Sequence, residues 1–163
     1  MARKISILVV NGPNLNLLGE RDPNIYGSQT LDDINGYIKT SLRGIELRSR
    51  EYGIDVSISV SFYQSNHEGA LIDCIQDARK VYDGIVFNPG AYTHYSYALH
   101  DAVEAIRIPV IEVHLSDIST REEFRRTSVI APACAGQVKG MGRKGYIDAI
   151  EKLVVLVTDE DLR

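Results

Sequence analysis

The chain has 163 residues, of which 44% are hydrophobic and 25% are charged, and these proportions are typical of one globular domain spanning residues 1–163. They argue against a disordered, collagen-like or coiled-coil protein. The formal net charge of −4 argues against general binding to a nucleic-acid backbone, so we expect no nucleic-acid partner. A local cluster of basic residues is still compatible with this net charge.

Short apolar runs alternate along the chain with segments of helical period. Residues 5–10 form a nearly continuous apolar run, which is typical of a central parallel strand covered on both faces. Thr30 begins a capping sequence with an acidic residue three positions on, and the apolar spacing after it predicts a helix that ends near Gly53. Hydrophobic residues that alternate with serines over 55–63 predict a second strand.

The same alternation continues toward the C-terminus. Helices are predicted over 68–82, 98–106 and about 146–158, and strands over 84–87, 110–114 and 137–140. This order predicts an α/β fold, a flavodoxin-like, doubly wound three-layer sandwich with a five-stranded parallel sheet. Ligands of such folds bind beyond the carboxyl ends of the strands, so the residues that follow the strands are the candidates for function.

The connection after the first strand is about twenty residues long, whereas two to six residues are usual in α/β units, and this length is typical of a lid. It lacks the glycine and lysine pattern of a phosphate-binding loop. Arg21 and Tyr26 both lie in it. A guanidinium within a few ångströms of a phenol favours the phenolate, so the pair could form a strong base. The alternative is that Tyr26 packs against the domain and Arg21 is solvated.

Polar residues also follow the third and fourth strands. The sequence Asn-Pro-Gly-Ala-Tyr-Thr-His at 88–94 places His94 near a helix N-terminus, where it could meet a polar or anionic ligand or simply belong to a capping cluster. The spacing of two puts Glu112 and His114 on the same side of the fourth strand. A carboxylate beside an imidazole favours the protonated ring, which could then act as a general acid; a structural histidine is the alternative.

Three arginines come soon after that strand, Arg121, Arg125 and Arg126. One of them could clamp a carboxylate or hydroxyl groups beside a cleft, and a solvated face is the alternative. His67 and His100 are expected at the surface. Because the histidines do not have the spacing of metal ligands, we expect no metal site.

The two cysteines, Cys74 and Cys134, have no paired spacing of metal ligands either, and we expect buried free thiols in a reducing cytoplasm. The first apolar run is too short for a secretion signal. No stretch approaches the roughly 20 apolar residues that cross a membrane. The sequence therefore predicts a soluble cytoplasmic protein that does not enter a membrane.

Six segments taken together resemble type II 3-dehydroquinate dehydratase over essentially the whole chain. They include Asn-Gly-Pro-Asn-Leu-Asn at 11–16, Asn-Pro-Gly-Ala-Tyr-Thr-His at 88–94 and Glu-Val-His-Leu-Ser at 112–116; the others begin at Arg21, Phe62 and Arg121. The resemblance implies dehydration of 3-dehydroquinate to 3-dehydroshikimate by anti elimination through an enolate. That reaction belongs to the shikimate pathway of aromatic amino acid biosynthesis or to quinate breakdown, and the family uses no metal or cofactor.

The resemblance also implies a role for each residue of the site. Tyr26 would remove the proton next to the ketone, with Arg21 promoting its phenolate. Asn14 would hold a water at the enolate oxygen. His114, oriented by Glu112, would protonate the departing hydroxyl. The substrate contacts implied are the side chains of Asn88, His94 and Arg125, the backbone N–H groups of Leu115 and Ser116, and Asp101 from a neighbouring subunit.

The family builds trimers and joins four of them into a twelve-subunit shell, so a homododecamer is implied. Tyr95, His100 and Asp117 depart from the residues common at their positions. The first two could alter the trimer contact, and Asp117 places a charge near the carboxylate pocket. Two other readings stay open: a non-catalytic flavodoxin-like module that binds a nucleotide or flavin at the same strand ends, and a structural subunit that only assembles.

Overall fold

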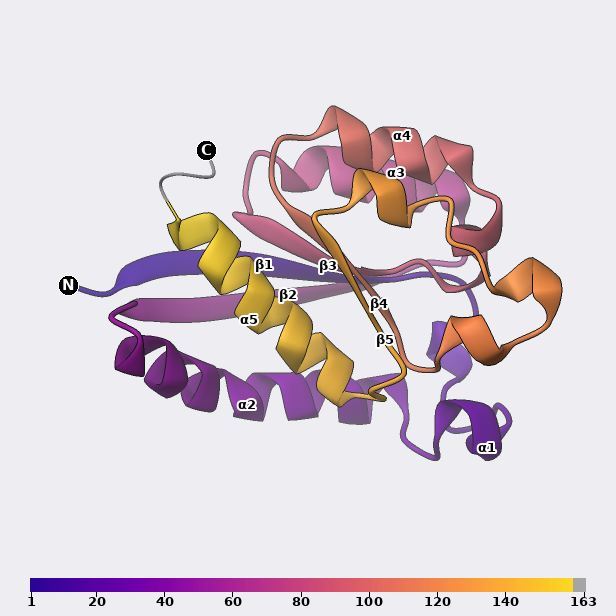
Figure 1. Cartoon of the computed structure of the whole chain (residues 1–163), viewed down its shortest axis with the longest axis horizontal. Coiled ribbons are helices and arrows are strands. Elements are labelled where there is room, and N and C mark those ends of the chain that lie inside the picture. The colour runs from indigo at the N-terminus through magenta and orange to yellow at the C-terminus, as the bar shows by residue number, and fades with distance from the viewer. Residues whose placement is uncertain (160–163) are drawn as a thin grey trace.

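A computed structural model describes residues 1–159 (Figure 1). A five-stranded parallel sheet has the order β2-β1-β3-β4-β5. Its strands are β1 (Arg3–Asn11), β2 (Val56–Gln64), β3 (Gly84–Asn88), β4 (Val110–His114) and β5 (Gly136–Lys139). Helices α2 (Leu31–Glu51) and α5 (Lys144–Thr158) cover one face, and α3 (Glu68–Ala78) and α4 (Tyr97–Ala105) cover the other. The predicted α/β fold, with its doubly wound strand order, is confirmed.

Strand β1 lies inside the sheet, paired with β2 and β3. Its side chains contribute to the hydrophobic cores on both faces of the sheet. Ile5, Ile7 and Val9 belong to the core beneath α2 and α5. Leu8 and Val10 belong to the core beneath α3 and α4. Full burial of each such side chain contributes roughly 1.5–3 kcal/mol, which explains why this strand reads as a continuous apolar run.

The start of α2 follows the sequence prediction closely. The Thr30 side chain accepts the Asp33 N–H at 3.1 Å, and the Asp33 side chain accepts the Thr30 N–H at 3.0 Å, which completes a capping box. None of the helices within residues 1–159 is long and apolar enough to cross a membrane.

The end of α3 differs from its prediction. The helix stops at Ala78 rather than near residue 82, and Val81, expected on its apolar face, is 68% exposed. The cause is Asp83, whose N–H donates to the Ser6 carbonyl and whose side chain accepts the Ser6 N–H, both at 2.8 Å. The chain must leave the helix early to reach that position at the sheet.

The two cysteines are free, as expected, but they are half-buried rather than buried. Burial still raises the pKa of Cys74 to about 11 and that of Cys134 to about 12. Both thiols are therefore neutral at physiological pH.

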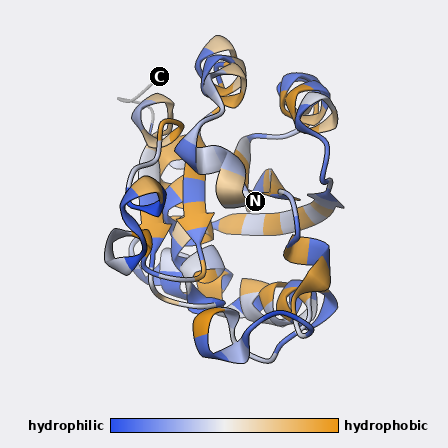
Figure 2. Cartoon of the chain, turned by 90° about the vertical axis from the view of Figure 1, so that its right-hand side faces the viewer, coloured by the Kyte–Doolittle hydropathy of each residue, from blue (hydrophilic) through white to orange (hydrophobic). Residues whose placement is uncertain are grey.

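The long connection after β1 contains a 3₁₀ turn, η1 (Leu15–Leu17), and a short helix, α1 (Pro23–Tyr26). It lies at the carboxyl end of the sheet, where the connections after β3 and β4 also lie (Figure 1). Figure 2 views this end: hydrophobic strands occupy the centre, and the connections in front of them are largely hydrophilic. A polar site is expected at such an end of a doubly wound sheet.

Candidate active site

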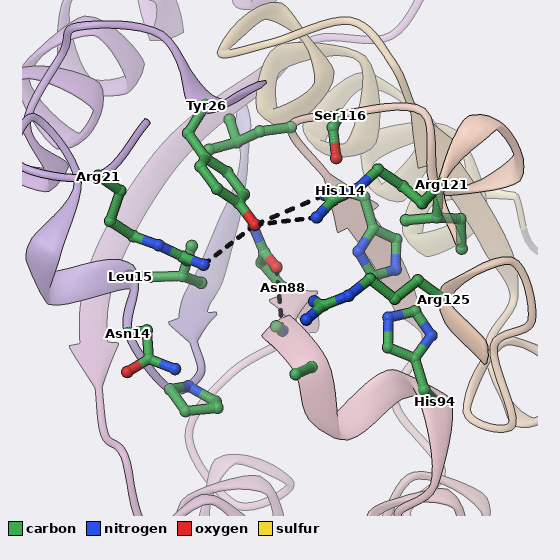
Figure 3. Close-up of a pocket in the computed structure, with 15 residues that line it drawn as sticks. Asn14, Leu15, Arg21, Tyr26, Asn88, His94, His114, Ser116, Arg121 and Arg125 are labelled. Atoms are coloured by element: carbon green, nitrogen blue, oxygen red, sulfur yellow. Dashed lines mark hydrogen bonds between the residues drawn. The ribbon is translucent and has the colours of Figure 1, made fainter. Parts of the chain in front are cut away.

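A cavity opens at the carboxyl end of the sheet, between the connections after β1, β3 and β4 (Figure 3). Eight of the side chains singled out in the sequence line it: Asn14, Arg21, Tyr26, Asn88, His94, His114, Arg121 and Arg125. Leu115 and Ser116, predicted to bind through their backbone N–H groups, line it as well. The fold thus gathers residues from three strand ends into one place.

Gly12 brings two of these strand ends together. Its N–H donates to the Asn88 carbonyl at 2.7 Å. A Cβ at this position would lie 2.6 Å from the Pro89 carbonyl oxygen, which is closer than real atoms approach. Only glycine therefore allows the connections after β1 and β3 to pack this closely.

Two guanidinium groups face the phenol oxygen of Tyr26 (Figure 3). Arg21 Nη2 donates to Tyr26 Oη at 3.0 Å, and its Cζ lies 4.0 Å from the ring centroid. Both terminal nitrogens of Arg121 lie 3.5 Å from the same oxygen. The sequence marks Arg121 only as one of three clamp candidates, because its position beside Tyr26, 95 residues away, depends on the fold.

The connection holds Tyr26 in place by local structure. Asp22 caps α1 by accepting the Asn24 N–H at 3.0 Å, and Pro23 occupies the first helical position, where its missing N–H costs nothing. Tyr26 packs against the core with its ring while its hydroxyl reaches the cavity. The position of Tyr26 therefore fits both predictions: its ring packs against the domain, and its hydroxyl is available for chemistry in the cavity.

The connection is anchored at one end and has two special backbone positions. Leu15 and Leu18 are buried in the core. Gly19 and Gly27 have positive φ values of 92° and 78°, which favour glycine. Arg21 and Tyr26 lie between these two glycines.

Glu112 and His114 form a buried pair on β4, as the spacing of two predicted. His114 Nε2 lies 2.5 Å from Glu112 Oε1, and neither side chain is more than 6% exposed. Burial alone would raise the pKa of Glu112, but the hydrogen bonds from His114, Thr93 and Ser128 hold it below its ordinary value. An ionised Glu112 favours a proton on the imidazole that borders the cavity.

Asn88 is fixed by a chain of buried hydrogen bonds that the sequence did not predict. Its Oδ1 accepts the Gly90 N–H at 3.2 Å, and its Nδ2 donates to Tyr146 Oη at 3.1 Å. The Tyr146 hydroxyl donates in turn to Asn11 Oδ1 at 2.6 Å. Burial raises the pKa of Tyr146 far above its ordinary value, so the hydroxyl stays neutral and keeps its proton for this bond.

His94 and Asn14 are also held by neighbouring segments. His94 Nδ1 lies 2.8 Å from the Thr127 carbonyl oxygen, which can only accept, so Nδ1 carries a proton and Nε2 is left for a ligand. Asn14 has a positive φ of 66°, a conformation that asparagine tolerates, and its N–H donates to Asn66 Oδ1 at 2.9 Å.

Two of the predicted site residues do not line the cavity of their own chain: Glu112 lies behind His114, and Asp101 is exposed on α4. His100 and Glu104 lie beside it, with the ligand atoms of the three within 4.8 Å of one another. Tyr95 is exposed near the start of the same helix. Asp117 caps the turn after β4 by accepting the Ser119 hydroxyl and N–H, which lower its pKa.

Comparison with known proteins places these residues in a family. Residues 5–154 match the family model for dehydroquinase class II. The 3-dehydroquinate dehydratase of Caldicellulosiruptor bescii is 55% identical over 149 residues, which are 90% of this chain and 94% of the relative. That of Bacillus subtilis is 49% identical over 147 residues, which are 90% of this chain and 92% of the relative.

Solved structures of type II dehydroquinases are similar to this chain as well. The type II dehydroquinase of Butyrivibrio crossotus is similar with a TM-score of 0.80 and 49% identity, covering 92% of this chain and 97% of the other. That of Propionibacterium acnes has a TM-score of 0.73 and 38% identity, covering 98% of this chain and 100% of the other. Because the family model, the relatives and the structures all match along nearly the full length, the chain belongs to the class II dehydroquinase family.

Proposed function

We propose that this chain dehydrates 3-dehydroquinate to 3-dehydroshikimate by anti elimination through an enolate. The observation that carries the proposal is the pairing of two groups on one cavity: a phenol that faces two guanidinium groups, and an imidazole bonded to a buried carboxylate. Such a cavity offers a base and an acid to the same bound molecule. Membership of the class II dehydroquinase family supports the assignment.

Tyr26 is the base of the first step. A C–H bond next to a ketone is weakly acidic, so its proton needs a strong and well-placed acceptor. The charges of Arg21 and Arg121 stabilise negative charge on the phenol oxygen, which takes the proton while the C–H electron pair moves into an enolate. Asn14 holds a water that donates to the enolate oxygen.

His114 is the acid of the second step. The ketone re-forms in conjugation with a new carbon–carbon double bond as the carbon–oxygen bond breaks. Hydroxide is a poor leaving group, so His114 protonates the departing oxygen, which leaves as water, while Glu112 stabilises the charged ring. Each of these proton transfers contributes about 10²–10⁴-fold to the rate, and positioning supplies much of the rest.

The remaining groups bind the substrate. Asn88, His94 and Arg125 hold its hydroxyl groups and polar edges. The backbone N–H groups of Leu115 and Ser116 hold its carboxylate. Asp101 completes the cavity of a neighbouring subunit within a trimer, and four trimers form a homododecamer in the cytoplasm. The reaction needs no metal or cofactor, and it serves the shikimate pathway or quinate breakdown.

The product gives a direct test, since a conjugated enone absorbs ultraviolet light and the substrate does not share that absorption. Purified protein is mixed with 3-dehydroquinate, with and without borohydride treatment in the presence of substrate. We expect absorbance to rise in both samples. Activity abolished by borohydride would reveal a lysine imine and overturn the role of Tyr26. Folded protein that produces no absorbance change would contradict the dehydratase assignment itself.

A further inference from the structure

The buried carboxylate of Glu112 contacts more than the imidazole. The Ser128 hydroxyl lies 2.9 Å from Oε1 and 3.0 Å from Oε2. The Thr93 hydroxyl also contacts Oε1, and Gln137 Nε2 lies 3.5 Å from Oε2. Thr93, Ser128 and Gln137 do not line the cavity, so these contacts serve Glu112 rather than a ligand.

The proton of the Ser128 hydroxyl can be placed by counting its partners. The N–H groups of Ile130 and Ala131 donate to Ser128 Oγ at 3.2 and 2.9 Å, which occupies both of its lone pairs. Its own proton must therefore point at the carboxylate. Thr93 Oγ1 lies 2.6 Å from Ser128 Oγ but finds no free lone pair there, so the Thr93 proton also points at Glu112.

This arrangement of donors favours the ionised form of Glu112. An ionised carboxylate can accept from every group around it, whereas a protonated one would bring a proton of its own toward the Ser128 and Thr93 hydroxyl groups, which both donate. Ser128 cannot turn its proton away without losing its bonds to the backbone. Hydrogen bonds to a charged acceptor are worth more than neutral ones, so their loss would destabilise the ionised form more than the neutral one.

The chain segment that carries Ser128 is itself held in place. The His94 ring donates to the Thr127 carbonyl at 2.8 Å, and the Val129 N–H donates to the Thr93 carbonyl at 2.7 Å. Ser128 lies between these two bonds. The same short segment thus orients His94 in the cavity and places the Ser128 hydroxyl against Glu112, the carboxylate behind His114.

We propose that Thr93 and Ser128 are positioning residues of the acid: by holding Glu112 as an anion they keep the proton of the pair on His114. Neither residue touches the substrate, and each acts through Glu112. The inference rests on the proposed function, since it assigns His114 the task of giving up that proton.

Few other ionisable groups face the pair within the described part of the chain. Cys134, next to β5, lies close to Glu112, and its thiol stays neutral because its pKa is about 12. Across the cavity, His114 shares its surroundings with Tyr26, His94 and three arginines, Arg21, Arg121 and Arg125. Removing the hydroxyl of Thr93 or Ser128 therefore perturbs the Glu112–His114 pair without adding or removing a charged group near it.

The test compares Thr93→Val with Thr93→Ser. The first removes the hydroxyl at almost constant shape, and the second restores it. We expect Thr93→Val to lower kcat about 10- to 100-fold with little change in KM, and Thr93→Ser to recover most of the loss. Without the Thr93 hydroxyl, Glu112 is a stronger base, so the pair should hold its shared proton to higher pH but with more of that proton on Glu112. The alkaline fall of kcat should therefore begin at higher pH in Thr93→Val, from a lower plateau. Ser128→Ala should act in the same direction, and Ser57→Ala, which removes an exposed hydroxyl on β2, should change nothing.

A second readout needs no substrate. In protein labelled with ¹⁵N-histidine, the Nε2 proton of His114 should resonate far downfield because of its short bond to Glu112, and it is assigned by its loss in His114→Ala. Thr93→Val should move this resonance, because the shared proton lies closer to Glu112, and should raise the pH at which the pair loses that proton. An unchanged resonance and an unchanged pH profile would overturn the proposal, even if kcat fell. Inactive wild-type protein would instead overturn the proposed function, and the titration would still test the coupling.

Discussion

Tyr146→Phe removes one hydroxyl from the interior and leaves the aromatic ring in place. That hydroxyl accepts from Asn88 at 3.1 Å and donates to Asn11 at 2.6 Å, and all three side chains are at most 3% exposed. The substitution leaves one buried donor and one buried acceptor without a partner, each at a cost of about 1–3 kcal/mol. We expect the free energy of unfolding to fall by roughly 2–5 kcal/mol, a large part of the 5–15 kcal/mol typical of a domain.

Thermal and denaturant unfolding measure this loss, at one fixed protein concentration because assembly shifts apparent stability. A fall in Tm of about 5–15 °C corresponds to the expected range for a domain of this size. KM for the substrate should rise as well, since the amide of Asn88 is no longer held on both sides. Tyr52→Phe, at a tyrosine that is 83% exposed, is the matched control. A loss below about 0.5 kcal/mol with unchanged KM would refute the reasoning.

Three further predictions follow from the site and the core. Tyr26→Phe should fold with an unchanged Tm but lose turnover by at least about 10³-fold, since it removes the proposed base; turnover close to that of the wild type would remove Tyr26 from the mechanism. The lowered pKa of folded Glu112 means that its contribution to stability is full above the ordinary value of 4.5 and is lost as pH falls below it, so acid unfolding should be less steep in Glu112→Gln. The raised pKa values of Cys74 and Cys134, about 11 and 12, predict slow alkylation at pH 8 in native protein and fast alkylation in denaturant; equal rates would contradict the burial of the thiols.

Much of the fold could be predicted because its three central strands, β1, β3 and β4, are buried on both faces for most of their length. Such strands read as apolar runs, and β1 gave a strong signal for that reason. The end of α3 could not be found in the same way. The apolar spacing continues through Val81, but Asp83 must meet Ser6 at the sheet, and that long-range requirement ends the helix early.

The contacts of the site show the same difference between local patterns, which could be predicted, and long-range contacts, which could not. The pairing of Glu112 with His114 could be predicted because a period of two along one strand is a local rule. The meeting of Arg121 with Tyr26 could not, since it joins two connections that are 95 residues apart in the sequence. The sequence indicated for Tyr146 only a place near the start of the last helix, because its hydroxyl finds Asn88 and Asn11 only through the folded sheet.

The two glycines around Arg21 and Tyr26 have a kinetic consequence. Leu15 and Leu18 anchor the connection in the core, so any outward movement of it would start no earlier than Gly19. Arg21 and Tyr26 would then move together, away from His114 and Asn88, which are carried by the ends of β4 and β3. If Tyr26 is the base, as proposed, proton abstraction would need the closed connection, and the rate of closure would set an upper limit on turnover.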